Sequence, residues 1–258
     1  MEGPNRISTL ERRRVILEEL RKNRQIFIPE LSRRFGVSEV TLRKDLKYLE
    51  NRNLLIRSRG GAMCPVQIGD DLPVESRQVM HIRQKKDIAA RAADLIEDGD
   101  TILLDSGTTI MQLAGLLGGK KNLTVITNAL DIAVRVATFE EVKLIVPGGV
   151  FRRKSHSLVG AMALNGLGVF RADKYFVSAD GLTSEGLFTS NLEEGELART
   201  IISHAKETIA LVDESKMGRT GQMNFADLDA ISVLVTNGAV PKHILDALAQ
   251  TGGLVLTA

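Results

Sequence analysis

The sequence predicts an α/β protein with two parts: an N-terminal winged helix-turn-helix, then a larger α/β domain with a mainly parallel sheet. Three observations predict this. Three short amphipathic helical patterns come first, and a glycine separates the second from the third. Two short apolar runs around a Gly-Gly turn follow them. Farther on, apolar runs of strand length alternate with helical patterns, which is typical of parallel sheets. We place the domains at 1–63 and 83–258, with a linker at 64–82.

The three N-terminal helices each carry a local signal. The first begins at the Ser-Thr-Leu-Glu sequence of residues 8–11, which has capping-box spacing. The second covers 29–35, with a proline in the first turn, where a missing N–H is tolerated. Gly36 makes the turn and Ser38 caps the third helix. Its apolar residues recur at i, i+4 and i+7: Leu42, Leu46 and Leu49.

Short strands follow these helices. Leu54–Arg57 and Ala62–Cys64 flank the turn Ser58-Arg59-Gly60-Gly61 and predict a wing. In the α/β domain the expected strands are Thr101–Leu104, Leu123–Ile126, Val142–Val146, Lys174–Ser178, Thr208–Val212, Ile231–Val235 and Leu254–Leu256. The expected helices cover about 84–97, 108–117, 129–138, 193–205 and 241–250.

The composition indicates a water-soluble protein. Hydrophobic residues make up 43% and charged residues 26% of the 258, as in globular chains. No apolar run reaches the roughly 20 residues that span a bilayer, and the first residues lack a secretion-signal pattern. The single Cys64 excludes a disulfide within the chain and fits a reducing compartment. We therefore expect a cytoplasmic protein with no membrane partner.

Charge is unevenly distributed along the chain. Residues 1–66 carry 15 Lys and Arg against 8 Asp and Glu, whereas the remainder carries 19 against 24. A basic segment attached to an acidic body is expected when one module binds nucleic-acid phosphate and the other does not. A solvated basic face without a partner would give the same charge pattern.

The third helix is the candidate DNA-reading element. A three-helix unit with a tight turn can place its third helix in the major groove, which is wide enough to admit one. Basic side chains on that helix can reach guanine edges or phosphates, and arginines in the wing can reach phosphate or the minor groove. An ordinary three-helix subdomain with solvated basic side chains is the alternative. The predicted DNA-binding residues are Ser38, Thr41, Arg43, Lys44, Lys47, Arg57 and Arg59.

The residues of this unit also match a known signature. The run Phe35–Leu46 is followed by Leu49-Glu50, Leu55, Arg57 and Gly60-Gly61-Ala62. This sequence resembles the helix-turn-helix of the DeoR family of sugar-metabolism regulators, and the resemblance implies DNA binding. Asn53 stands where the family has glycine, a mild change because Asn tolerates left-handed backbone angles. Arg59 stands where histidine is usual and adds positive charge to the wing.

Small polar residues follow the strands of the α/β domain. Asp105-Ser106-Gly107-Thr108-Thr109 joins a strand to a helix, so backbone N–H groups, hydroxyls and a positive helix end are available to a phosphate. It is neither a Walker A loop nor a Rossmann fingerprint; an ordinary helix cap is the alternative. Ligands of open α/β sheets lie outside the carboxyl ends of the strands. Other clusters follow strands in the same way: Thr127-Asn128, Gly148-Gly149, Asp180-Gly181 and Asp213–Lys216.

Together these clusters resemble the sensor domain of DeoR-type regulators, which is similar in fold to ribose-5-phosphate isomerase and related phosphosugar isomerases. The resemblance implies that residues 106–109 hold a phosphate, with Asn128, Gly149, Asp180 and Lys216 lining the sugar site. Glu193 and Glu194 stand where a contact to a sugar hydroxyl is expected. The predicted effector-binding residues are Asp105, Ser106, Gly107, Thr108, Thr109, Asn128, Gly148, Gly149, Asp180, Gly181, Glu193 and Lys216.

Two functions fit these features. The first is a DNA-binding transcriptional regulator, a repressor of a sugar or polyol catabolic operon that a phosphorylated sugar releases from operator DNA. Twofold operators then imply a homodimer or homotetramer. The second is a phosphosugar isomerase with a DNA-binding appendage, in which Asp180, Glu193 or Glu194 is the base and Lys216 the stabilising cation. An enzyme leaves residues 1–63 unexplained, so we favour the regulator and expect no catalytic residues.

We also expect neither a metal nor a cofactor. The four histidines are scattered, and none stands at metal-ligand spacing from Cys64. The basic run Arg152-Arg153-Lys154 fits a solvated loop, and a role near an anionic effector is the alternative.

Overall fold

The computed structural model describes residues 7–258 except 24, 53, 59 and 64–70. The chain divides into two compact units, Met1–Gln67 and Ile68–Ala258. The predictions for Asn53, Arg59 and Cys64 lie outside the described residues.

The first unit is a three-helix bundle with a small antiparallel sheet. Its elements are α1 (Thr9–Asn23), β1 (Gln25–Phe27), α2 (Ile28–Phe35), α3 (Glu39–Glu50), β2 (Ile56–Ser58) and β3 (Gly61–Met63), with strand order β1-β3-β2. The predicted apolar stripe of α3 is buried together with Ile16 and Leu20 of α1. Gly36 ends α2 at φ 61°, a left-handed angle that glycine adopts without strain. The sequence missed only β1, which pairs with the wing.

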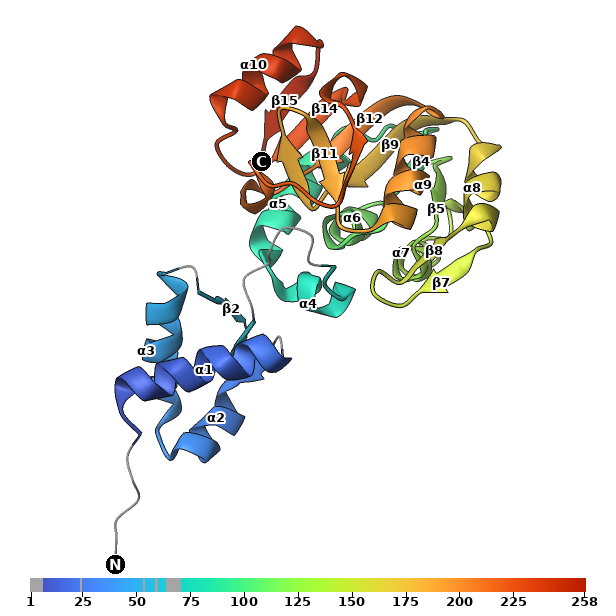
Figure 1. Ribbon diagram of the computed structural model, residues 1–258. Coiled ribbons are helices and arrows are strands. Elements are labelled where there is room, and N and C mark those ends of the chain that lie inside the picture. Colours follow the sequence, from blue (N-terminus) through green and yellow to red (C-terminus); the bar gives the residue numbers. More distant parts are fainter. Residues whose placement is uncertain (1–6, 24, 53, 59, 64–70) are drawn as a thin grey trace, which may run out of the picture. The chain divides into compact units, whose positions relative to one another are not determined.

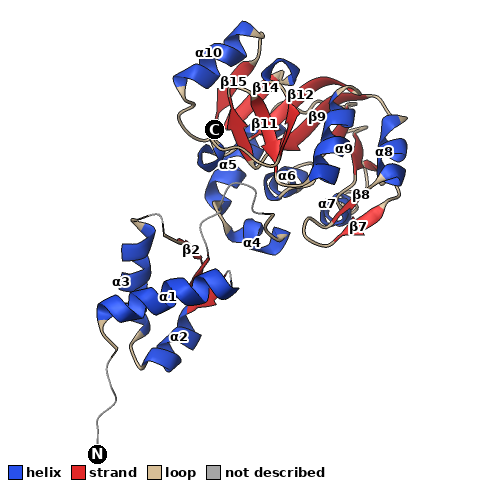
Figure 2. Ribbon diagram, in the orientation of Figure 1, coloured by secondary structure: helices blue, strands red, loops and turns tan. Residues whose placement is uncertain are grey.

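The second unit is built on seven parallel strands in the order β15-β14-β12-β9-β4-β5-β6 (Figure 1, Figure 2). These strands are β4 (Thr101–Leu104), β5 (Thr124–Thr127), β6 (Lys143–Ile145), β9 (Ala172–Ser178), β12 (Ala205–Leu211), β14 (Val233–Thr236) and β15 (Leu254–Thr257). The fold class predicted from the sequence, a helix-turn-helix followed by an α/β domain with a parallel sheet, is confirmed.

Helices cover both faces of this sheet. One face packs against α5 (Ile82–Ala93), α6 (Thr108–Ala114) and α7 (Leu130–Val136). The other face packs against α8 (Ala161–Gly168), α9 (Leu192–Ile202) and α10 (Lys242–Gln250). Successive side chains of a strand point to opposite faces of the sheet, so β9 contributes to both cores. Tyr175 and Val177 are buried in one core, and Phe176 is buried in the other.

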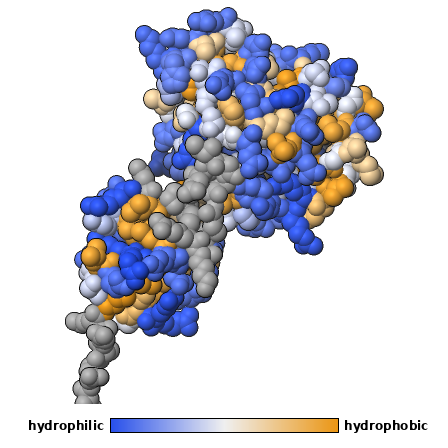
Figure 3. Space-filling model, in the orientation of Figure 1, coloured by the Kyte–Doolittle hydropathy of each residue, from blue (hydrophilic) through white to orange (hydrophobic). Residues whose placement is uncertain are grey.

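Short antiparallel pieces surround the parallel sheet. They are the hairpin β7 (Val150–Arg152) with β8 (Ser157–Val159), and the sheet β10 (Gly181–Thr183), β11 (Gly186–Thr189) and β13 (Met223–Ala226). Two short 3-10 helices cover Glu214–Lys216 and Leu228–Ala230. On the side where Figure 1 labels β7 and α8, Figure 3 shows apolar side chains at the surface, and Val150, Phe151 and Met162 are exposed there.

The stretch 64–82, expected to be a linker, contains a helix. Residues 74–79 form α4 (Val74–Val79), whose first N–H donates to the carbonyl of Lys154 at 2.7 Å. Helix α4 also packs against α6 of the second unit. Two prolines hid this helix from the sequence pattern, but Pro73 only precedes its first turn, where proline is tolerated.

Candidate functional site

The order of the parallel strands points to one place for a ligand. From β4 the chain proceeds outward through β5 and β6, whereas from β9 it proceeds the other way through β12 and β14. The strand order therefore reverses between β4 and β9, and ligands of open α/β sheets bind beside the carboxyl ends at such a switch point. The segments that follow these two strands, 105–109 and 179–181, include seven of the predicted effector residues.

The turn after β4 requires a glycine. Gly107 has φ 147°, and a Cβ at this position would lie 2.4 Å from the Ser178 hydroxyl oxygen. The same Ser178 hydroxyl donates to the carbonyl of Ser106 at 3.3 Å, which ties the ends of β4 and β9 together. Thr108 and Thr109 are buried, so a ligand approaches this turn over Asp105 and Ser106, which are partly exposed.

The Asp105 carboxyl has a raised pKa, which favours its protonated, neutral form. Burial, together with the nearby charge of Glu194, raises the pKa of Asp105 to about 8, against the opposing effect of the Ser106 and Ser178 N–H groups. Burial and the Asp105 charge likewise raise the pKa of Tyr175 on β9 well above its usual range. A neutral Asp105 places no negative charge beside an anionic ligand.

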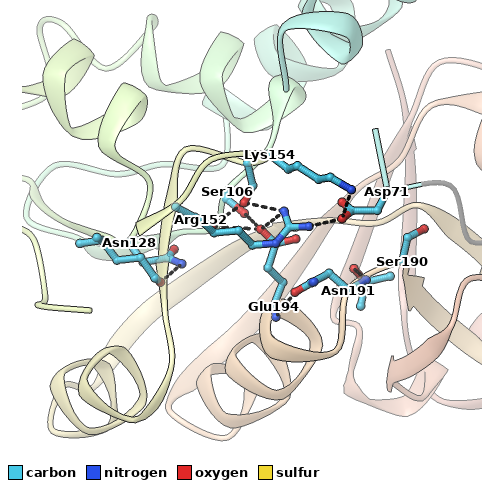
Figure 4. Close-up of polar contacts among 12 residues, drawn as sticks. Asp71, Ser106, Asn128, Arg152, Lys154, Ser190, Asn191 and Glu194 are labelled. Carbon is cyan, nitrogen blue, oxygen red and sulfur yellow. Dashed lines mark hydrogen bonds and ion pairs between the residues drawn. The ribbon is translucent and has the colours of Figure 1, made fainter. Parts of the chain in front are cut away.

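Glu194, not Glu193, is the glutamate that reaches this edge. Asn191 caps α9 by accepting the N–H of Glu194 at 3.0 Å, which fixes the first turn. The Glu194 carboxylate then accepts from Ser157 at 3.0 Å and from Ser106 at 3.4 Å (Figure 4). Glu193 is exposed on the same turn. Neighbouring residues on a helix point in directions about 100° apart. The sequence alone does not show which of the two glutamates faces the site.

Asn128, after β5, is held with one polar atom free. Its side-chain NH2 group donates to the Leu158 backbone carbonyl at 3.0 Å, and the Asn128 backbone carbonyl accepts the Leu158 N–H at 2.8 Å. Among the described residues, the buried Asn128 Oδ1 has no hydrogen-bond partner. A buried acceptor without a partner is costly and rare, and a ligand hydroxyl would satisfy it.

Asp180 is part of the turn after β9, and its side chain lies near Arg77 of helix α4. Its carboxylate accepts the Ser190 N–H at 2.9 Å and lies 3.9 Å from the Arg77 guanidinium. Arg77 Nε is buried and unpartnered among the described residues, so it is a free donor at the same edge. Gly181 must be glycine, because a Cβ would lie 2.2 Å from the Arg219 carbonyl oxygen.

Cations gather at the next strand end, around Asp213. The Asp213 side chain accepts the Ser215 N–H at 3.0 Å and so starts the short 3-10 helix that carries Lys216. Burial lowers the pKa of Lys85 to about 8, with the charge of Asp213 opposing this and that of Lys216 adding to it. Burial also lowers the pKa of His81, which Asp213 opposes. Lys85 donates to the Arg77 carbonyl at 2.5 Å, which joins this group to α4.

Gly148 and Gly149 lie farther out, before β7. Gly148 is exposed, whereas a Cβ on Gly149 would meet Leu158 Cβ at 2.9 Å. Gly149 therefore allows the hairpin to pack closely, and the structure gives neither glycine a contact with Ser106 or Asp180.

Sequence reasoning missed four side chains that the fold brings to this edge. Lys85 looked like part of an ordinary amphipathic helix, and Arg77 fell in the predicted linker. Arg152 lay in a basic run read as a solvated loop, yet its side chain is only 10% exposed. Asp71, also in the predicted linker, pairs with Arg152 (Figure 4). Of these four residues, only Arg152 had a signal in the sequence, because a role near an anionic effector was the alternative given for its basic run.

Helix α3 presents the predicted DNA-binding residues. Ser38 caps it by accepting the Thr41 N–H at 3.2 Å, so its hydroxyl also serves the helix. Arg43 pairs with Glu39 at 2.7 Å. Lys44 and Lys47 are exposed and make no ion pair within the described part of the chain.

Ion pairs with the wing and with helix α1 hold helix α3 in place. Arg57 of β2 pairs with Glu50, the last residue of α3, at 2.8 Å, which fixes the wing against the helix. On the inner side of α3, Asp45 is 2% exposed and accepts from Arg12 at 2.6 Å and Arg13 at 2.8 Å of α1. The sequence analysis gave no role to Asp45, whose charge looked like one more surface residue.

Neither a metal-binding group nor a membrane-spanning helix is present among the described residues. No group of three or more His, Cys, Asp and Glu side chains there is arranged to hold a metal ion. None of the helices described is both long and apolar enough to cross a membrane.

Comparison with known proteins covers both units. The DeoR-like helix-turn-helix domain matches residues 12–67, and the DeoR C-terminal sensor domain matches residues 80–238. The transcriptional regulator GolR of Listeria innocua is 32% identical over 94% of this chain and 96% of its own. The transcriptional repressor GlcR of Bacillus subtilis is 31% identical over 94% and 93%. The glycerol-3-phosphate regulon repressor of Escherichia coli is 29% identical over 93% and 95%.

Solved structures were compared as well. Ribose 5-phosphate isomerase A of Methanocaldococcus jannaschii matches 52% of this chain and 53% of its own at 21% identity, with a TM-score of 0.39. The relatives that match almost the whole chain are named as transcriptional regulators, so the isomerase hypothesis is set aside. The chain belongs to the DeoR family: it is a DNA-binding transcription regulator, not an enzyme, with a helix-turn-helix domain and a sensor domain.

Proposed function

We propose that this regulator is a cytoplasmic repressor of a sugar or polyol catabolic operon, and that a phosphorylated sugar binding at the β4–β9 edge releases it from operator DNA. The observation that carries the effector half is the set of unsatisfied groups at that edge. Arg77 Nε is a buried donor and Asn128 Oδ1 a buried acceptor, and neither has a partner among the described residues. A ligand with an anionic group and hydroxyls supplies both partners.

The charges at the edge support an anion. Arg77, Lys85 and Lys216 lie around the strand ends, while the raised pKa of Asp105 favours its neutral form. A phosphate bound over Ser106 would meet the start of α6, where the first N–H groups of the helix lack internal partners. A relative named the glycerol-3-phosphate regulon repressor agrees with this ligand class.

The DNA half rests on α3 and the wing. Lys44 and Lys47 are exposed, without an ion pair in the described residues, and suited to phosphate or guanine contacts. A homodimer or homotetramer would place two such helices on a twofold operator. Light scattering of the purified protein measures that oligomeric state directly.

The test is an operator titration with and without candidate effectors. The operator is selected from random duplex DNA, and binding is followed by fluorescence anisotropy. Phosphorylated sugars and polyols, with their unphosphorylated counterparts as controls, are added at saturating concentration. The expected result is a loss of operator affinity of about 5- to 150-fold with one phosphorylated compound. No change with any compound would remove the effector half.

Single substitutions separate the two halves. Lys44→Ala is expected to weaken operator binding by about 1–3 kcal/mol and to leave effector binding intact, if the lysine makes a specific base contact. Lys216→Ala and Ser106→Ala are expected to abolish induction and to leave operator affinity intact. Equal damage to both functions by all three variants would contradict the division into two modules.

A further inference from the structure

The segment that leads into the second unit is held by the β7–β8 hairpin at three points. Asp71 pairs with Arg152 and with Lys154, the latter at 3.1 Å. The Val74 N–H donates to the Lys154 carbonyl at 2.7 Å. Glu75 lies 3.2 Å from His156 Nε2. We call these contacts of residues 71–75 with the hairpin the clasp.

Arg152 belongs to the clasp and to the candidate site at once. Its side chain is 90% buried, with 10% exposed. One guanidinium nitrogen pairs with Asp71, while the other donates to Ser155 at 2.9 Å and lies 3.6 Å from Glu194 (Figure 4). The same Glu194 oxygen accepts from Ser106. An anion bound over Ser106 therefore lies within reach of the Arg152 guanidinium.

The far end of the segment also contacts the site. Arg77 of α4 lies 3.9 Å from Asp180, and its buried Nε lacks a partner among the described residues. Residues 71–77 thus contact the site at both ends, through Arg152 and through Arg77. Along the chain, Asp71 follows residues 64–70, which connect it to the helix-turn-helix.

We propose that Arg152 is an effector-binding residue that exchanges partners: in the empty protein it holds Asp71, and when an anionic effector binds it turns to the ligand and opens the clasp. This inference rests on the proposed function and names the contact through which the ligand acts. A guanidinium fork binds a phosphate through two parallel hydrogen bonds, which outcompetes one carboxylate already shared with Lys154. Opening the clasp changes the segment through which the two units are connected.

The exchange makes Asp71 a competitor of the ligand. Removing the Asp71 charge frees Arg152, so ligand binding should become tighter, whereas removing Arg152 should weaken it. Opposite signs from two partners of one ion pair distinguish a switch from a structural contact, because breaking a merely structural pair from either side has the same effect. Arg153→Gln is the matched control, since Arg153 is exposed on the same hairpin and carries the same charge.

The experiment titrates inorganic phosphate and glycerol 3-phosphate into the full chain by calorimetry in a buffer free of other phosphate. Arg152→Gln is expected to weaken phosphate binding about tenfold or more, Asp71→Asn to strengthen it several-fold, and Arg153→Gln to leave it within twofold. Arg152→Lys, which keeps the charge but not the fork, is expected to fall between wild type and Arg152→Gln. Hydrogen exchange of the Val74 amide should accelerate when phosphate binds the wild type and should already be fast in Asp71→Asn.

The outcomes separate this proposal from the proposed function. If both anions bind the wild type but Arg152→Gln and Arg153→Gln bind them alike, the exchange is overturned and the effector site stands. Weaker binding by Asp71→Asn, or an unchanged Val74 amide on ligand binding, also overturns the exchange. If neither anion binds the wild type, both the exchange and the phosphate effector are overturned, whereas DNA binding is unaffected by that result.

Discussion

Asp45 shows how one buried charge holds the DNA-reading helix. Both of its oxygens accept from arginines of α1, and its side chain is 3% exposed. Asp45→Asn leaves Arg12 and Arg13 with an uncompensated charge in a buried place, which costs about 3 kcal/mol or more of unfolding free energy. Denaturant unfolding of the full chain, with hydrogen exchange of α1 and α3 as the local readout, measures this loss.

The matched control is an exposed pair on the same helix. Glu39→Gln breaks the pair with Arg43, whose two side chains are 43% and 58% exposed, and is expected to cost less than about 0.5 kcal/mol. Similar losses for the two variants would mean that burial adds nothing to the Asp45 pair.

Asp105 makes stability depend on pH with a definite sign. Its pKa rises from the ordinary 3.8 to about 8 in the folded chain. Between these values the folded state holds one more proton than the unfolded state, so the unfolding free energy falls as pH rises, and the fall ends above about pH 8. Asp105→Asn imitates the protonated acid, so its advantage over the wild type should grow across this pH range. Urea unfolding at several pH values tests this, and parallel pH profiles would contradict it.

Residue roles at the site divide into those that sequence can predict and those it cannot. Ser106, Asp180 and Lys216 were predicted because they follow strands, and parallel strands end at one edge. Glu194 was predicted beside Glu193, without the helix phase that separates them. Lys85 and Arg152 were missed as site residues because a basic side chain shows its burial only after helices and hairpins from distant segments have packed around it.

At the scale of elements, the sequence predicted the strands of the parallel sheet better than the short antiparallel strands around it. All seven parallel strands were expected, because each contains an apolar run and the series alternates with helical patterns along the chain. The hairpin β7–β8 and the sheet β10-β11-β13 were not expected, because each of these short strands includes a polar residue or a glycine, and no helical pattern separates β7 from β8 or β10 from β11. The hairpin that the sequence did not predict provides Arg152 and Lys154 to the clasp. The proposed switch therefore depends on elements that the sequence predicts least well.

The turn between β4 and α6 offers a test of element geometry. Gly107→Ala adds a left-handed backbone penalty and a contact of 2.4 Å with the Ser178 hydroxyl, so we expect a loss of about 2–4 kcal/mol in unfolding free energy. Gly119→Ala is the control, because Gly119 also has a positive φ of 96° but open space around it, and should cost only about 1 kcal/mol.

A second substitution isolates the steric part of that loss. Ser178→Ala removes the hydroxyl and leaves the Ser178 Cβ at an ordinary 3.5 Å from the new methyl group. The double variant should therefore recover part of the loss measured by denaturant unfolding of Gly107→Ala. No recovery would assign the whole effect to the backbone.

Helix α3 should bind DNA with a salt dependence that follows its ion pairs. Lys44 and Lys47 are free of ion pairs among the described residues, so each alanine variant should lower the slope of log K against log salt by about 1 if the lysine contacts phosphate. Arg43 already pairs with Glu39, so Arg43→Ala should change the slope less. Anisotropy titrations at several salt concentrations give the slopes; an unchanged slope for both lysine variants would place the DNA on another face.

At the scale of the whole molecule, the proposed function requires that two separately packed units communicate. Each unit has its own hydrophobic core, so neither needs the other to bury its apolar residues. In the proposed function the signal passes along the chain, and the segment 71–77 touches the candidate site through Arg152 and Arg77. A small number of charged contacts suits this task, because an anionic ligand changes their energy without disturbing either core.

The final prediction follows from the thermodynamic linkage between effector binding and operator binding. If the effector lowers operator affinity by some factor, saturating operator must lower effector affinity by the same factor, about 5- to 150-fold for a coupling of 1–3 kcal/mol. Anisotropy with DNA and calorimetry with the effector measure the two factors independently. In Asp71→Asn the clasp is already open, so the effector has less to release and both factors should shrink together toward one. A full coupling factor in that variant, with tighter effector binding, would show that Arg152 exchanges partners but that the signal to the helix-turn-helix travels by another route.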